Sequence, residues 1–225
     1  MPRRPTRTVP TVLLPGPFGA AEQDWQHWLA GQLSAAGREV RVAAWPAPES
    51  ADLAGCLAAL RQSMAGLPDD GFDVLAHSAA CLLWLHHAAD TGTADNGAAD
   101  SGTADSGAAD TGTADSASAA SGSPRPSRVA LVAPPAPDRP LPAWDFLRPA
   151  PLAVDALRRA ADGTVLVGGD DDPHCPGGVA PVYGAPLKMA ATVIAGAGSL
   201  TAADGYGPWP AVLDWCGRDN LAFLA

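Results

Sequence analysis

Short apolar segments alternate with amphipathic ones along most of this 225-residue chain, and this alternation limits the folds that it can adopt. Six segments have the length and composition of buried strands: residues 11–16, 39–45, 72–77, 128–136, 163–173 and 191–199. Helical spacing is found between and after them, at residues 23–37, 51–67, 79–89, 177–186 and 207–217. Strands that alternate with helices form mainly parallel sheets with helices on both faces. The sequence therefore predicts one three-layer α/β domain over residues 1–225, with function at the carboxyl ends of its strands.

A low-complexity segment interrupts this alternation at residues 90–127. Aspartate recurs every five residues from Asp90 to Asp115, and large apolar side chains are missing. Such a segment cannot offset the entropy of ordering itself, so we expect a disordered insertion. Because it follows the third helix, we expect it to leave the domain at the edge opposite the functional strand ends.

The charge and the apolar content exclude several classes of protein. The net charge of −10 leaves no basic stripe for phosphates, so we expect no nucleic-acid partner. Neither a membrane-spanning run nor a signal-peptide core is present, which predicts a cytoplasmic protein without a membrane partner. Four scattered cysteines, Cys56, Cys81, Cys175 and Cys216, lack metal-ligand spacing and are expected to be free thiols. We expect no metal and no organic cofactor.

Ser78 is the candidate nucleophile. It follows a predicted strand directly and precedes a predicted helix, in the sequence Ala-His-Ser-Ala-Ala at residues 76–80. A strained strand-to-helix turn of this kind needs small residues two positions before and after the serine, and alanine is the next smallest choice after glycine. The alternative interpretation is an ordinary serine at a tight turn in an alanine-rich chain.

Four segments, in order, resemble the small α/β-hydrolases of the retinoblastoma-binding serine hydrolase (YdeN-like) family: PGPFGAAEQDWQHWL, VLAHSAACLLWLHHAA, LVGGDDDPHCP and GAGSLTAADGYGPWP. The resemblance implies a three-layer α/β-hydrolase fold and a serine hydrolase of carboxylesterase type that acts on a small ester or amide. It also implies that Ser78 is the nucleophile and that Asp172 is the acid of the triad. Asp171 is the neighbour that an alignment by eye confuses with Asp172.

Two positions depart from the family pattern. The position of the triad histidine holds Ser199, which has no titration near pH 7 and cannot act as the base. The oxyanion hole is expected to use the N–H of Ala79 and a second N–H from the loop after the first strand. That second position is Pro17, which has no N–H, although Phe18 or Gly19 could donate if the loop is displaced.

Another histidine would have to replace the missing base, and His174 is the candidate because it lies two residues after Asp172. His77 is expected to point away from the pocket and to be structural. His86 and His87 lie too far along their helix from Ser78 at 1.5 Å per residue. His27 lies on the first predicted helix.

Aromatic residues near the predicted active-site edge are candidate pocket residues: Phe18, Trp144 and Phe146.

Two functions remain open. One is a serine hydrolase with an impaired triad, and the other is a catalytically silent pseudo-hydrolase that binds a small molecule or a partner protein. A decaying gene product without a selected function is a third reading that one sequence does not decide.

Overall fold

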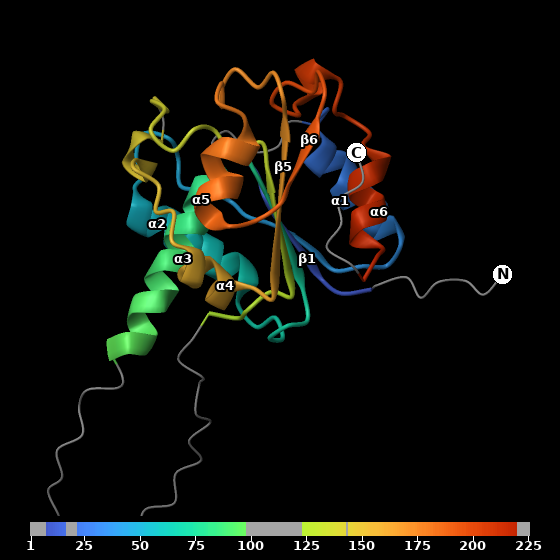
Figure 1. The fold of residues 1–225 in the computed structure, drawn as a ribbon. Helices are drawn as coiled ribbons and strands as arrows, with labels where there is room; N and C mark the ends of the chain where they lie inside the picture. Colours follow the sequence, from blue (N-terminus) through green and yellow to red (C-terminus); the bar gives the residue numbers. More distant parts are fainter. Residues whose placement is uncertain (1–7, 17–21, 98–122, 143, 220–225) are drawn as a thin grey trace, which may run out of the picture.

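The computed structural model describes residues 8–16, 22–97, 123–142 and 144–219 (Figure 1). Six strands form one sheet in the order β2-β1-β3-β4-β5-β6, and every neighbouring pair is parallel. The strands are β1 (Thr11–Leu14), β2 (Val40–Val42), β3 (Asp73–His77), β4 (Arg128–Val132), β5 (Gly163–Gly169) and β6 (Ala191–Ile194). All six predicted strands are confirmed. All six are shorter than predicted, and after β1, β4, β5 and β6 the residues left out include Gly, Pro or Asp residues that belong to the connecting loops.

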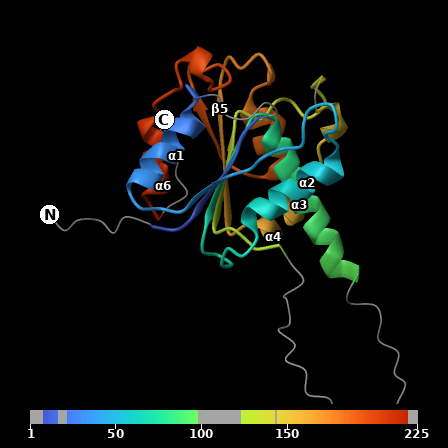
Figure 2. The same ribbon diagram turned by 180° about the vertical axis from the view of Figure 1, so that it is seen from behind.

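Helices cover both faces of the sheet, which confirms the predicted three layers (Figures 1 and 2). One face carries α1 (Trp25–Ala35) and α6 (Pro210–Cys216). The other carries α2 (Leu53–Met64), α3 (Ala79–Gly97), α4 (Val154–Ala160) and α5 (Ala185–Leu187). Short helical turns are η1 (Asp145–Leu147), η2 (Ala180–Gly184) and η3 (Ala202–Asp204). The sequence analysis missed α4, which is too short for its apolar spacing to stand out.

Two apolar cores lie on the two faces of the sheet. Along β3, Val74 and Ala76 belong to the core under α2 and α3, whereas Leu75 belongs to the core under α1 and α6. Successive strand residues point to opposite faces, so a strand buried on both sides is apolar almost throughout. This accounts for the continuous apolar run that marks β3 in the sequence.

A buried ion pair joins the amino ends of the two central strands. Asp73 and Arg128 lie opposite each other in the β3–β4 register, and the Arg128 Nε donates to the Asp73 carboxylate at 3.0 Å. The side chains are 0% and 4% exposed, and Arg38 lies 3.9 Å from the same carboxylate. Arg128 also donates to the carbonyls of Trp215 and Arg218 at 3.2 and 2.7 Å. The pair therefore fastens the C-terminal end of α6 to the sheet.

The helix α3 continues to Gly97 and so includes the start of the predicted insertion. Asp90 forms an ion pair with Arg61 of α2, and the Thr91 hydroxyl donates to the Ala88 carbonyl at 3.0 Å. The helix therefore runs past residue 90, where the insertion is expected to begin. The α3 helix begins at the carboxyl edge of the sheet and ends beyond the opposite edge (Figure 1).

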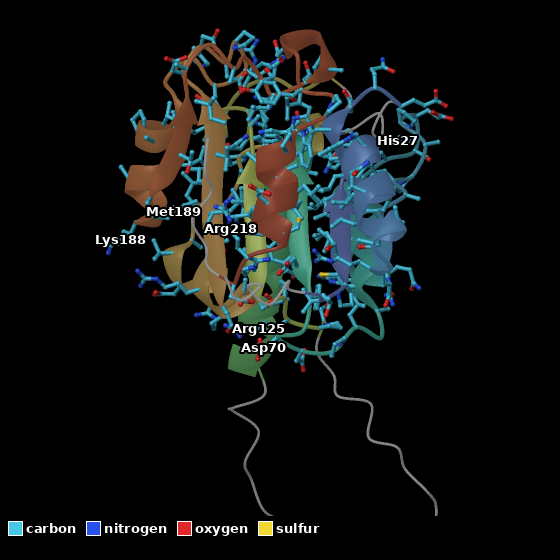
Figure 3. The ribbon with its side chains drawn as sticks, turned by 90° about the vertical axis from the view of Figure 1, so that its right-hand side faces the viewer. His27, Asp70, Arg125, Lys188, Met189 and Arg218 are labelled. Atoms are coloured by element: carbon cyan, nitrogen blue, oxygen red, sulfur yellow. The ribbon has the colours of Figure 1, made fainter. Side chains whose placement is uncertain are left out.

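The end of the predicted insertion is also attached to the domain. The backbone N–H of Arg125 donates to Asp69 at 2.9 Å, and its guanidinium pairs with Asp70 and Asp162. Figure 3 shows Arg125 beside Asp70 at the amino edge of the sheet. Residues 98–122, the middle of the predicted insertion, lie outside the described residues.

Two further findings concern the helices and the thiols. In the part of the chain that the structure describes, none of the helices is long and apolar enough to cross a membrane. All four cysteines are free and buried, as the sequence predicts. Burial raises the pKa of the Cys175 thiol to about 11 and that of Cys216 to about 12, so both are uncharged at neutral pH.

Asp73→Asn is expected to lower the free energy of unfolding by about 3–5 kcal/mol, because it leaves the Arg128 charge buried without its partner. Urea denaturation measures the change. The matched control is Asp70→Asn, whose carboxylate is 55% exposed in its pair with Arg125 and which should lose less than about 1 kcal/mol. Equal losses in the two variants would contradict a structural role for the buried pair.

Replacing residues 98–122 by a short Gly-Ser linker is expected to leave the fold intact. Loop-closure entropy changes by only about 0.6 kcal/mol for each twofold change in loop length, so the midpoint of urea denaturation should rise slightly or stay the same. A marked loss of stability would mean that this segment packs against the domain.

Candidate active site

Ser78 lies in the sharp turn between β3 and α3. Its φ of 56° is in the left-handed region, which costs free energy for a residue with a side chain. The Ser78 N–H donates to the Val132 carbonyl at 2.9 Å, and the Cys81 N–H donates to the Ser78 carbonyl at 3.0 Å. Ala76 and Ala80 are fully buried beside the turn. This is the strand-to-helix turn that the small residues around Ser78 predict.

The loop after β1 passes next to Ser78. A Cβ placed on Gly16 would lie 3.6 Å from the Cβ of Ser78, so the two backbones approach closely. Ala79, which follows Ser78, is the first residue of α3. The loop therefore reaches the place where a second oxyanion donor is expected. Pro17 and Phe18, the predicted oxyanion and pocket residues of this loop, lie outside the described residues.

Three consecutive aspartates after β5 bind the loop that follows β6. Asp170 accepts the N–H of Gly196 at 2.8 Å, and Asp171 accepts the N–H of Gly198 at 2.7 Å. Asp172 accepts the hydroxyl of Ser199 at 2.6 Å. The strands β5 and β6 are parallel neighbours, so both loops leave the sheet at its carboxyl edge. The acidic run therefore holds residues 196–199 against the end of β5, although only Asp172 of the three aspartates is buried.

Two glycines allow the loops to meet. A Cβ on Gly169 would collide with the Gly198 carbonyl oxygen. Gly198 itself has a φ of 53°, and a Cβ there would collide with the carboxylate of Asp204. Glycine at these two positions lets the loop after β6 pack directly on the end of β5.

Each polar group of Ser199 has a hydrogen-bond partner. Its hydroxyl donates to Asp172, its N–H donates to Asp204 at 3.2 Å, and its carbonyl lies 3.0 Å from the His77 Nε2. Because His77 immediately precedes Ser78, Ser199 lies beside the turn that carries the candidate nucleophile. The structure thus brings Asp172 and Ser199 together and places Ser199 against the residue that precedes Ser78.

Asp172, and not Asp171, is the partner of Ser199. The Asp172 residue is 1% exposed, whereas Asp171 is exposed and binds only the loop backbone. The Asp172 Oδ1 accepts two hydrogen bonds, from the Ser199 hydroxyl and from the His174 N–H at 2.8 Å. The Asp172 Oδ2 is buried and has no hydrogen-bond partner among the described residues. One oxygen of the carboxylate is therefore satisfied and the other is not.

His77 has a structural position. A carbonyl oxygen can only accept a hydrogen bond, so the His77 Nε2 is protonated and donates to the Ser199 carbonyl. The ring packs edge-on against Trp25, with centroids 5.5 Å apart. Burial lowers the pKa of His77 despite the opposing effect of the Ser199 carbonyl and nearby carboxylates. A neutral ring bound in this way agrees with the structural role predicted for it.

The other four histidines do not bond to Ser78. His174 is exposed, and it contacts Asp172 through its backbone N–H and not through its ring. His86 lies 3.0 Å from the Leu147 carbonyl, and burial lowers the pKa of His87 to about 4. His27 projects from the outer side of α1 (Figure 3). No hydrogen bond joins the Ser78 hydroxyl to any described side chain.

Two of the three predicted pocket aromatics, Trp144 and Phe146, are described. Trp144 is 1% exposed; its ring packs edge-on against Trp45, with centroids 5.5 Å apart, and lies tilted against Phe146, with centroids 6.0 Å apart. The Trp45 Nε1 donates to the Pro15 carbonyl at 2.9 Å. Trp144 therefore supports this loop from within the core, and Phe146 is the more exposed of the two candidates.

Asp204 belongs to the site, and the sequence analysis missed it. Its carboxylate accepts the N–H groups of Ser199 and Thr201 and the Thr201 hydroxyl at 2.7 Å. Burial would raise the pKa of Asp204, but the hydrogen bonds from Thr201 and Ser199 outweigh burial and lower it. The spacing of Thr201 and Asp204 is that of a capping box, a pattern that could have indicated this role.

Comparison with known proteins bears on the family and the fold of the chain. A family model described as "Serine hydrolase" matches residues 11–99 and 111–217. No curated protein matches the sequence. The ydeN gene product from B. subtilis has a similar structure, with a TM-score of 0.64 at 16% identity over 92% of this chain and 96% of that one.

Two further structures share the fold. A YdeN-like hydrolase from Pectobacterium atrosepticum has a TM-score of 0.61 at 17% identity, over 92% of this chain and 89% of that one. A carboxyl esterase from the fungus Tuber melanosporum has a TM-score of 0.50 at 14% identity, over 85% and 69%. The fold is thus that of the α/β-hydrolases, and the family match extends over most of the chain. The chain belongs to the serine hydrolase family.

Proposed function

We propose that this protein is a serine hydrolase of carboxylesterase type whose triad is impaired because Ser199 occupies the position of the base. Ser78 attacks the carbonyl carbon of a small ester or amide, and Asp172 is the acid of the triad. The observation that supports this proposal is the 2.6 Å hydrogen bond from the Ser199 hydroxyl to Asp172. It puts a hydroxyl where the acid should orient an imidazole.

A serine in this position cannot take the proton of the nucleophile. A neutral hydroxyl is too weak a base to accept the Ser78 proton near pH 7, so Ser78 attacks without general-base assistance. Loss of the triad histidine in a well-studied protease lowers turnover by about 10⁶-fold. We therefore expect slow acylation of Ser78 and a need for reactive substrates.

The oxyanion hole is a second point of weakness. Ala79 offers its backbone N–H at the start of α3, whereas Pro17 has no N–H to offer. One missing oxyanion donor costs roughly 3 kcal/mol of transition-state stabilisation. Phe18 or Gly19 would have to donate in its place.

The alternative function is a catalytically silent pseudo-hydrolase that binds a small molecule or a partner protein. The same two residues, Ser199 and Pro17, favour it. The two functions differ in one respect that can be measured, namely whether the Ser78 hydroxyl reacts with an electrophile at all.

A fluorophosphonate probe is expected to form one slow adduct with the wild-type protein, detected by intact mass and absent in Ser78→Ala. Ser78 is partly exposed in its strained turn, but no base accelerates the reaction. A folded wild-type protein that forms no adduct over many hours would support the silent pseudo-hydrolase instead.

Ser199→His is expected to accelerate adduct formation and hydrolysis of 4-nitrophenyl acetate by about 10²–10⁴-fold, the usual contribution of a positioned general base. The backbone contacts of residue 199 do not depend on its side chain, so an imidazole there should face Asp172. Ser199→Ala is the matched control and should stay at the wild-type rate. Adding Pro17→Ala to Ser199→His should raise the rate further if that position belongs to the oxyanion hole. No gain in Ser199→His would contradict the assigned base position.

A further inference from the structure

The unsatisfied oxygen of Asp172 is the feature of the site that the proposed function leaves unexplained. The Asp172 residue is 1% exposed, and its Oδ2 has no hydrogen-bond partner among the described residues. Leaving a buried acceptor unsatisfied costs about 1–3 kcal/mol, and more when the group is charged. A buried carboxylate oxygen in this state is a binding position for an N–H donor, best of all a cationic one.

Two short contacts lead from this carboxylate to His77, the residue before the nucleophile. The Asp172 Oδ1 accepts the Ser199 hydroxyl at 2.6 Å, and the Ser199 carbonyl lies 3.0 Å from the His77 Nε2. His77 is joined directly to Ser78. These contacts connect the carboxylate to the turn through one residue that has a small side chain.

No described basic side chain is in position to use this oxygen. His77 is bound to the Ser199 carbonyl, and His174 turns its backbone N–H to Asp172. The only lysine of the sequence, Lys188, borders a hollow of about 180 Å³ together with Gly163 and Thr164, at the amino end of β5. The hollow is therefore at the opposite edge of the sheet from Ser78, and Lys188 is labelled on that side of the molecule in Figure 3.

We propose that the substrate itself supplies the base: the site takes acyl compounds that carry an imidazole, one nitrogen of which donates its N–H to the Asp172 Oδ2 while the other accepts the proton of Ser78. This inference rests on the proposed function, because it requires Ser78 to be a nucleophile. It deepens that function by naming the class of substrate.

The reaction then balances without an added reactant. As the bond from the Ser78 Oγ to the carbonyl carbon forms, the hydroxyl proton passes to the substrate nitrogen, and the carbonyl electron pair moves to its oxygen. When the tetrahedral intermediate collapses, the bond to the leaving alkoxide breaks and the alkoxide takes this proton. If the nitrogen is in the acyl part, it remains to accept a proton from the attacking water, and the acid leaves with the Ser78 hydroxyl restored.

Free imidazole tests the binding position. Imidazole should accelerate fluorophosphonate labelling of Ser78 in the wild-type protein, saturably and by about 10²-fold, as a positioned general base does. The matched compound 1-methylimidazole is also a base, but it has no N–H for Asp172 and should accelerate labelling far less. Asp172→Asn should abolish the saturable effect. Equal, linear acceleration by both compounds, or none by either, would overturn the inference.

A pair of esters tests the substrate class. The wild-type protein should hydrolyse N-acetylhistidine methyl ester about 10²-fold faster, in kcat/KM, than N-acetylphenylalanine methyl ester. In Ser199→His the chain has its own base, so the preference should largely disappear. If the wild type hydrolyses both esters at the same rate and Ser199→His also hydrolyses both, the inference is overturned but the proposed function stands. If Ser199→His hydrolyses neither ester and forms no Ser78 adduct, the proposed function fails as well.

Discussion

The register of the central strands depends on the buried ion pair between Asp73 and Arg128. The two residues lie opposite each other at the amino ends of β3 and β4, and Arg128 also binds carbonyls at and just beyond the end of α6. A slip of one residue would turn every side chain of β3 to the other face and would bury a charge without its partner. The pair therefore also determines where the far end of β3 lies, and with it the position of Ser78.

At the carboxyl edge of the sheet, the backbone contacts that position residue 199 do not depend on its side chain. Asp204 and His77 bind the backbone of Ser199, and the aspartates before it bind the backbone of Gly196 and Gly198. Only one of these contacts, the hydroxyl bond to Asp172, involves the Ser199 side chain. The backbone of this loop therefore keeps its position whether or not the side chain of residue 199 can act as a base. The geometry of the site does not by itself determine its catalytic rate.

The residues that flank the repeat-bearing segment and the residues of the candidate site are at opposite edges of the sheet. The α3 helix begins directly after Ser78 and carries the chain away to Gly97, and Arg125 attaches the returning chain near the amino ends of the strands (Figures 1 and 3). Loop-closure entropy grows slowly with length, so an insertion between these two points has little thermodynamic effect on the sheet. The separation allows the segment to vary without disturbing the residues around Ser78.

The sequence by itself determined the six strands, the small residues around Ser78 and the lack of an N–H at residue 17. Each of these depends on local periodicity or on one residue's own chemistry. The family resemblance already implied Asp172, but only the tertiary structure shows its contact with Ser199 and the bond from His77 to the carbonyl of residue 199. These contacts join side chains from three different strand ends, and no spacing along the chain encodes them. They form because a parallel sheet brings the carboxyl ends of β3, β5 and β6 to one edge.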